Sequence, residues 1–360
     1  MKKIMIGLAS SLLLSTAAMA ADASDWESMV AQAKKEGSVT FNVWYLQPQW
    51  RSFVQEFEKE YGIKVRIPEG SLDGNVNKLM AESGKPKGKI DVIALSVAQL
   101  PMIMGAKSLT KVDDLPGYAQ AYHQLQNIDT QGYGVAFWGN QTGLAYDPQQ
   151  MGDRPLPQTF EDLQHFIDAN PKKFGYNDPN NGGAGEAFIQ RIVTSRSGDF
   201  NSEAETVDPA VVKNWRQGWQ WFSANNDKIT HTASGADSLT RLNDGELMLT
   251  PAWEDHLSGL QKTGAITPRL KFYIPQFGMP GGGNIAAIAA NSPHPAASRV
   301  FLNWLIQADT QKALSHAFGS TPMNKQVQPD VQRPEAEVQF FGKPYSMQLR
   351  KEFVRQVMMQ

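Results

Sequence analysis

The chain has 360 residues, no cysteine and a formal net charge of −2, with 41% hydrophobic and 10% aromatic residues. The absence of cysteine excludes disulfides, thiolate metal ligands and cysteine nucleophiles. The near-neutral charge does not favour nucleic acid or an anionic membrane surface as a partner. Because this length exceeds what one hydrophobic core usually serves, we expect two lobes.

The first twenty residues have the composition of an export signal. Lys2 and Lys3 precede an apolar stretch that ends in Ala18-Met19-Ala20. A cationic head, a short apolar middle and a small-x-small exit are typical of a cleaved Sec signal peptide, and the middle is too short to span a bilayer. We therefore expect residues 1–20 to be removed and the mature chain to lie in the periplasm.

The first part of the mature chain predicts a βαβαβ unit. Strands of apolar and β-branched residues alternate with segments whose apolar residues recur at helical spacing. Such strands form a parallel sheet, and ligands bind beyond their carboxyl ends. The segments after the strands carry Trp44, Tyr45, Ser71 and Ser96 as candidate ligand contacts. The expected strands are 39–43, 63–67 and 90–95, and the expected helices are 25–35, 50–61 and 75–82.

The middle of the chain predicts a second α/β lobe. Two strands, 134–138 and 142–146, are expected to flank a polar bend. After the last strong amphipathic helix, we expect a polar, proline-spaced tail. Further strands are expected at 247–250, 272–274 and 285–289, and helices at 159–167, 185–194, 209–222, 295–306 and 310–318.

Aromatic and acidic residues follow two of the expected strands. Trp44 and Tyr45 can present their rings to a planar or cationic solute, although packing of the lobes explains them equally well. Trp253 and Asp255 follow the strand at 247–250. The run Glu254-Asp255-His256 does not favour a shared metal ion, because adjacent side chains point in different directions.

A glycine-rich segment, Asn181 to Gly185, precedes a predicted helix. A glycine turn at a helix start can hold an anion with backbone N–H groups. Glu186 would repel a phosphate from the first turn, which favours a simple turn over an anion site. Gly70-Ser71 is a similar possibility.

Three short motifs and one long C-terminal stretch resemble those of a known family. Their order and spacing together, rather than any one of them, make the match specific. The chain resembles the periplasmic solute-binding proteins of ABC importers, in the branch that contains iron, thiamine, polyamine and phosphonate binders. The resemblance covers essentially the whole mature chain. The motifs are Asp91 to Leu95, Gly143 to Pro148, Pro157 to Leu163, and Ser292 to Asn324.

The resemblance implies an α/β, type II periplasmic-binding-protein fold. Each of two lobes would hold a mixed, mainly parallel sheet flanked by helices, and crossing hinge segments would join the lobes, with the solute in the cleft. Lobe 1 would comprise 21–137 and 287–360, and lobe 2 would comprise 138–286. The crossing would bring Trp138 and Asn140 to the cleft, and the return segment would bring Asn284. The glycines at 278, 281, 282 and 283 would serve as a hinge or a tight turn.

The resemblance also implies the partners: a small-molecule solute and an inner-membrane ABC permease, with a monomeric carrier that has no cofactor and no enzymatic activity. The chain lacks the Tyr-Tyr pair of iron binders, and Gly282-Gly283-Asn284 replaces the acid that polyamine binders carry on the return segment. The remaining acidic and aromatic residues, Trp253 to Asp255 with Trp44 and Tyr45, favour an organic cation.

Two alternatives remain open. A phosphate- or carboxylate-bearing solute would use Gly183, Gly185 and Ser71. A periplasmic hydrolase or transferase on the same fold would need a nucleophile and a base within reach of each other, and the sequence offers no recognisable pair.

Overall fold

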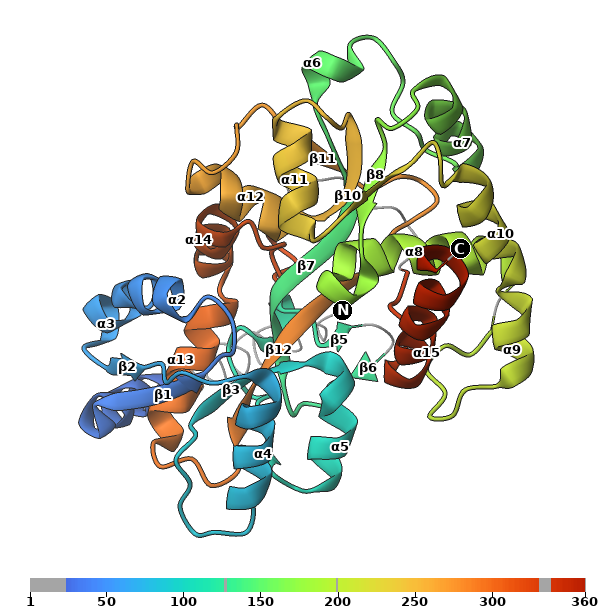
Figure 1. Ribbon diagram of the computed structural model, residues 1–360. Coiled ribbons are helices and arrows are strands. Elements are labelled where there is room, and N and C mark those ends of the chain that lie inside the picture. Colours follow the sequence, from blue (N-terminus) through green and yellow to red (C-terminus); the bar gives the residue numbers. More distant parts are fainter. Residues whose placement is uncertain (1–23, 126–127, 199, 330–337, 360) are drawn as a thin grey trace, which may run out of the picture. The chain divides into compact units, whose positions relative to one another are not determined.

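The computed structural model describes residues 24–125, 128–198, 200–329 and 338–359 (Figure 1). The predicted signal peptide, residues 1–20, lies outside the described residues. None of the helices within these ranges combines the length and apolarity needed to cross a bilayer. The chain divides into two compact units. Unit 1 comprises residues up to His123, Asp129–Phe137 and Asn284–Thr310, and unit 2 comprises Gln124–Ile128, Trp138–Gly283 and Gln311–Gln360.

The sheet of unit 1 is the expected βαβαβ arrangement. Strand β1 (Ser38–Asn42) lies between β2 (Lys64–Arg66) and β3 (Val92–Ser96), and all three are parallel. The second half of β12 (Gly281–Ala289) pairs antiparallel with β3, and β4 (Leu109–Thr110) pairs with β12. The helical segments of this unit are residues 24–36, α2 (Gln47–Phe53), α3 (Gln55–Tyr61), α4 (Leu72–Glu82), η1 (Val97–Gln99), α5 (Leu100–Gly105), η2 (Tyr118–Gln120) and α13 (Pro295–Ile306).

Aromatic packing fills the core of unit 1. The Phe41 ring of β1 lies 5.4 Å from Trp50 and 5.3 Å from Phe301, and all three side chains are fully buried. The single helix expected at 50–61 is two helices, because Val54 adopts φ −69° and ψ −7° between α2 and α3. Both helices still bury the predicted apolar face.

Unit 2 contains an antiparallel set of strands and a separate parallel two-stranded sheet. Strand β7 (Val135–Tyr146) pairs antiparallel with β10 (Leu249–Trp253) and β11 (Lys271–Tyr273), and β8 (Gly175–Asn177) is parallel to β9 (Thr230–Thr232). The remaining elements are β5 (Gln124–Leu125), β6 (Ile128–Asp129), α6 (Pro148–Met151), α7 (Phe160–Ala169), η3 (Pro179–Asn181), α8 (Gly183–Ser197), α9 (Pro209–Asn214), α10 (Arg216–Asn225), α11 (Gly235–Asn243), α12 (Glu254–Lys262), α14 (Ala308–Phe318), α15 (Lys343–Phe353) and η4 (Val354–Met358).

The bend expected near residues 139–141 is absent, because β7 is one continuous strand. Gly139 exchanges two backbone hydrogen bonds with Thr321, at 2.8 and 3.0 Å, and a Cβ on Gly139 would lie 2.8 Å from the Thr321 carbonyl oxygen. The Gln141 side chain donates to the Met279 carbonyl at 2.7 Å. The backbone of Gly139 and the side chain of Gln141 thus find backbone partners within a continuous strand.

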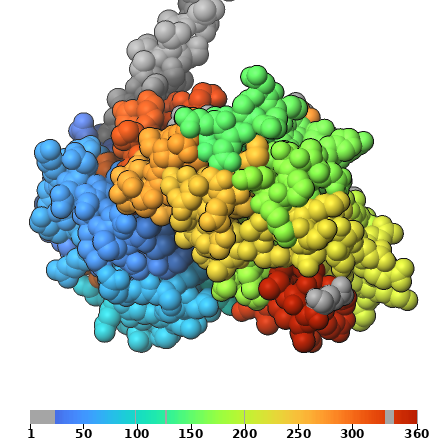
Figure 2. Space-filling view, turned by 45° about the horizontal axis from the view of Figure 1, so that its top comes forward, coloured from blue at the N-terminus to red at the C-terminus, as the bar shows by residue number. Residues whose placement is uncertain are grey.

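The tail expected after α14 contains a buried helix. Tyr345, Leu349 and Phe353 of α15 are at most 2% exposed and belong to the hydrophobic core of unit 2. This segment therefore lies in unit 2, whereas the sequence interpretation placed 287–360 in lobe 1. Figure 2 shows the C-terminal residues in red beside the yellow segment of α9 and α10.

Glycines 281–283 form neither a turn nor a loop, since they are the first residues of β12. A Cβ on Gly281 would lie 1.9 Å from Oε1 of Gln141, and one on Gly283 would lie 3.2 Å from the Trp138 carbonyl oxygen. These glycines allow close packing within unit 2.

Candidate ligand-binding surfaces

In unit 1, four of the predicted contacts gather at the carboxyl edge of the parallel strands. Ser96 is the last residue of β3, and Asn284 is its partner across the antiparallel pair. Trp44 and Tyr45 form the bend that directly follows β1. Parallel strands end at the same edge of a sheet, which explains why residues far apart in sequence meet here.

The aromatic pair forms one continuous surface. The rings of Trp44 and Tyr45 are 4.7 Å apart at 66°, an edge-to-face contact, and both side chains are half-buried. Nδ2 of Asn284 donates to the Tyr45 hydroxyl at 3.3 Å. This bond orients the Tyr45 ring and leaves aromatic area for a planar or cationic group.

The start of α4 carries a helix cap at the predicted Ser71. Oγ of Ser71 accepts from the Gly74 N–H at 3.1 Å, so this acceptor serves the helix. Beside it, Nδ2 of Asn42 donates to Oδ1 of Asn75 at 3.3 Å, and both side chains are buried. Among the described residues, Oδ1 of Asn42 and Nδ2 of Asn75 have no partner. This amide pair was not predicted from the sequence, although Asn42 ends the first strand and Asn75 lies in α4, the helix that follows the second strand.

In unit 2, three strands end at one edge and three helices begin there (Figure 1). Strand β8 is parallel to β9, and Phe174, just before β8, forms a parallel bridge with Leu249 of β10. Helices α8, α11 and α12 follow these three strands. Sequence analysis found the third strand of this set and missed β8 and β9, which have three residues each.

Helix α8 begins without a side-chain cap, at Gly182 with φ 150°. A Cβ on Gly183 would lie 3.0 Å from the Trp253 indole, which places that ring against the first turn. A Cβ on Gly185 would lie 2.0 Å from the Asn177 carbonyl oxygen, and Gly185 is buried. Gly185 therefore allows α8 to pack on β8, and Gly182 and Gly183 are the more accessible glycines.

The acid in the first turn of α8 is compensated inside unit 2. Glu186 is 3% exposed and accepts from Nε of Arg350 at 3.0 Å. Ser346 and Gln190 also donate to its carboxylate. Arg350 balances the negative charge of Glu186, so Glu186 does not exclude an anion from this helix start as the sequence suggested.

Trp253 and Asp255 begin α12 after β10. The Trp253 ring stacks on Phe340 at 5.5 Å and 21°, which covers one face of the indole. The Asp255 carboxylate accepts from the Trp138 side chain and, at 2.9 Å, from the N–H of His256. Burial raises the pKa of Asp255 to about 6, although both hydrogen bonds favour the ionised form.

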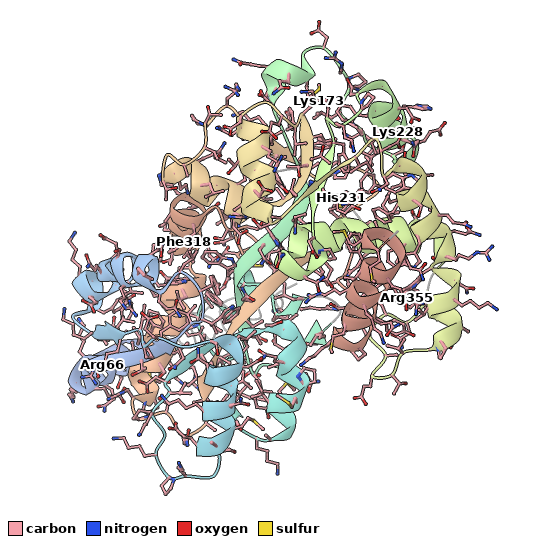
Figure 3. The ribbon with its side chains drawn as sticks, in the orientation of Figure 1. Arg66, Lys173, Lys228, His231, Phe318 and Arg355 are labelled. Atoms are coloured by element: carbon pink, nitrogen blue, oxygen red, sulfur yellow. The ribbon has the colours of Figure 1, made fainter. Side chains whose placement is uncertain are left out.

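Trp138 lies in the core rather than on the surface. Its side chain is 1% exposed, and the centre of its ring lies 5.0 Å from that of Phe318, which it meets edge-on (Phe318 is labelled in Figure 3). Trp138 thus positions the Asp255 carboxylate. Asn140, two residues further along β7, is half-buried.

His256 follows Asp255, and its ring lies 3.7 Å from the position of a Cβ on Gly235. Burial lowers the pKa of His256, which keeps the imidazole neutral at pH 7. Within the described ranges, no group of three histidine, aspartate or glutamate side chains is arranged to hold a metal ion.

The family model of the bacterial extracellular solute-binding proteins matches residues 52–340. The chain belongs to this family. A curated relative of this solute-binding protein is Protein YnjB of Escherichia coli strain K12, which is 24% identical over 349 residues, covering 89% of this chain and 88% of the relative. A solute-binding component of an ABC transporter acts on a small-molecule solute together with a membrane permease.

Solved structures show the fold of this solute-binding protein. PotD of Streptococcus pneumoniae strain Canada MDR_19A, the substrate-binding protein of a spermidine/putrescine ABC transporter, has a TM-score of 0.66 at 12% identity, covering 89% of this chain and 98% of PotD. The GacH receptor of Streptomyces glaucescens, solved alone and with acarbose, has a TM-score of 0.66 at 15% identity, covering 90% of this chain and 93% of the GacH chain. The fold is the two-lobed type II periplasmic-binding-protein fold, as the family resemblance implied.

Proposed function

We propose that this solute-binding protein is an exported periplasmic carrier that captures a small organic cation for an ABC importer. The observation that carries the choice of a cation is the Asp255 carboxylate. It lies at the strand-end edge of unit 2, is partly exposed, and is held by the buried Trp138. Among the described residues, no lysine or arginine forms an ion pair with it.

Charge pairing gives the physical reason. A carboxylate that is largely removed from water is costly unless a positive group compensates it, and a bound cation would supply that group. Trp253 adds aromatic surface close by, and the pair Trp44 and Tyr45 adds a second aromatic surface in unit 1. Aromatic rings attract cations by about 0.5–2 kcal/mol per ring, depending on desolvation.

A phosphate- or carboxylate-bearing solute is the second candidate, and the start of α8 favours it. Helix N-termini attract anions through backbone N–H groups and the helix dipole. Here the first turn has no side-chain cap, and Arg350 balances the charge of Glu186. Gly182 and Gly183 would be the anion contacts, whereas the buried Gly185 and the capping Ser71 are less suited.

Ligand identity and its pH dependence distinguish the two candidates. Native mass spectrometry of protein purified without denaturation is expected to reveal a co-purified small cation. Binding of a cation, measured by calorimetry, should weaken as pH falls through about 6, because Asp255 becomes protonated. Asp255→Asn should abolish that pH dependence. An anionic ligand whose affinity is unchanged by Asp255→Asn would refute the choice of a cation.

The hydrolase or transferase alternative is tested with the same preparation. A carrier returns its ligand unchanged, so mass spectrometry after prolonged incubation should recover the identified solute intact. Conversion of that solute at a rate proportional to protein concentration would contradict the proposal.

A further inference from the structure

Unit 2 contains a polar cavity at the end of α8, away from the start of that helix. The cavity has a volume of about 290 Å³ and is lined by Arg196, Ser197, Lys213, Asn214, Arg216 and Gln217. The first two residues end α8, the next two end α9, and the last two begin α10. Because α8 has 15 residues, its two ends are about 20 Å apart at 1.5 Å per residue.

Close packing of α10 on α8 forms the cavity. A Cβ on Gly218 would lie 2.9 Å from Cα of Val193, so this glycine lets the two helices approach each other. Trp215, between α9 and α10, is fully buried in the core. These two residues fix the junction whose polar neighbours line the cavity.

Three cationic residues line this cavity in a chain whose formal net charge is −2. Lys213 and Arg216 are exposed, and Arg196 is half-buried. The Arg196 guanidinium lies 5.3 Å from the centre of the Trp221 ring and 5.8 Å from that of Phe160, which restricts its position. Within the described residues, no carboxylate forms an ion pair with any of the three; Asp199 lies outside that part of the chain.

Helix dipoles explain only part of this charge. Arg196 and Lys213 lie in the last turns of α8 and α9, where a cation is favourable. Arg216 begins α10, directly after α9 and the single residue Trp215 in the αR conformation, so no open helix C-terminus favours a cation there. An anion shared by the three residues would compensate this charge.

We propose that this cavity, lined by Arg196, Lys213 and Arg216, binds a phosphate group, as a second site distinct from the solute-binding surfaces. Guanidinium groups bind phosphate oxygens in pairs, and a lysine adds a point charge. A volume of about 290 Å³ is at the lower limit of ordinary ligand pockets and suits a phosphate ester or a phospholipid headgroup.

Calorimetry on the full mature chain at low ionic strength tests the site, with inorganic phosphate as the first probe and sedimentation with phosphatidylglycerol vesicles as the second. Saturation by inorganic phosphate in a 1:1 complex would identify a soluble phosphate as a ligand. Binding to vesicles alone would identify a lipid headgroup. Either result supports the proposal if the binding is weakened by substitution of the residues that line the cavity.

The double variant Lys213→Gln/Arg216→Gln, which changes two exposed side chains, tests whether binding depends on the cavity. We expect it to bind the phosphate-bearing probe with at least tenfold lower affinity. Lys59→Gln/Lys351→Gln removes the same charge from exposed positions elsewhere and should change affinity less than twofold. The single variant Arg216→Gln repeats the test if the double variant does not fold. Equal losses in the two double variants, or no saturable binding of either probe, would overturn the proposal.

Discussion

Replacing Asp255 with Asn should stabilise the ligand-free protein at neutral pH while weakening the binding of a cationic solute. In the folded state burial raises the pKa of this carboxyl from the ordinary 3.8 to about 6. The ionised form is therefore less favourable in the folded protein than in the unfolded chain. Asn keeps an oxygen that accepts from Trp138 and carries no charge.

The size and sign of the effect follow from proton linkage. Below pH 3.8 the carboxyl is protonated in both states and contributes nothing. Between pH 3.8 and 6 only the folded state keeps the proton, so the free energy of unfolding falls as pH rises. At 1.36 kcal/mol for each pH unit, the loss reaches roughly 3 kcal/mol above pH 6. This value is an upper limit, because the side chain is partly exposed.

Urea unfolding of the ligand-free protein, followed by tryptophan fluorescence at intervals from pH 4 to pH 8, measures the difference. Asp255→Asn should be close to wild type at pH 4 and more stable by up to roughly 3 kcal/mol at pH 7.5. Asp153→Asn, which changes an exposed carboxylate of the same unit, should differ little at either pH. A stability difference that does not depend on pH, or a variant less stable at pH 7.5, would refute the reasoning.

Four further substitutions test the packing and an ion pair of unit 2, each by urea unfolding. Gly185→Ala places a methyl group 2.0 Å from the Asn177 carbonyl oxygen and should destabilise the protein by more than about 2 kcal/mol. Gly259→Ala, whose methyl group meets open space on α12, should stabilise the protein by roughly 0.5–1 kcal/mol. The reverse order of stabilities would contradict the packing of α8. Phe353→Ala should cost about 3–5 kcal/mol because the ring is fully buried, and a neutral result would mean that α15 is not part of the core. Burial raises the pKa of Asp147, and the hydrogen bonds from Arg269 lower it by more, so that the net pKa is lowered. Arg269→Met removes this partner and should lower the free energy of unfolding by about 2 kcal/mol at pH 7. The loss should shrink as pH falls and Asp147 becomes protonated.

Sequence patterns determined the order of most elements and the edge of the first sheet where a ligand would bind. Helix α13 occupies the predicted residues 295–306, because its apolar spacing and Pro295 at the start leave no other conformation comparably favourable. Trp44, Tyr45 and Ser96 were predicted to share one edge because parallel strands end together, and they do.

The continuous strand β7 and the helix α15 were not predicted from the sequence and became apparent only in the tertiary structure. The polar run at 139–141 reads as a bend, and only the backbone of Thr321 and Met279, far away in sequence, satisfies it within a strand. Helix α15 carries Tyr345, Leu349 and Phe353 at a spacing of four, a helical signal that the surrounding prolines and polar residues obscured.

Composition and periodicity thus predicted two α/β lobes, because burial of apolar faces depends on local spacing, and the resemblance to a family implied the type II fold. Charge at the candidate sites was decided by tertiary contacts. Glu186 seemed to oppose an anion until Arg350, 164 residues further along the chain, was placed against it. Asp255 has its raised pKa because folding buries it beside Trp138. Desolvation and ion pairing depend on which groups the fold brings together, and a linear sequence does not contain those distances.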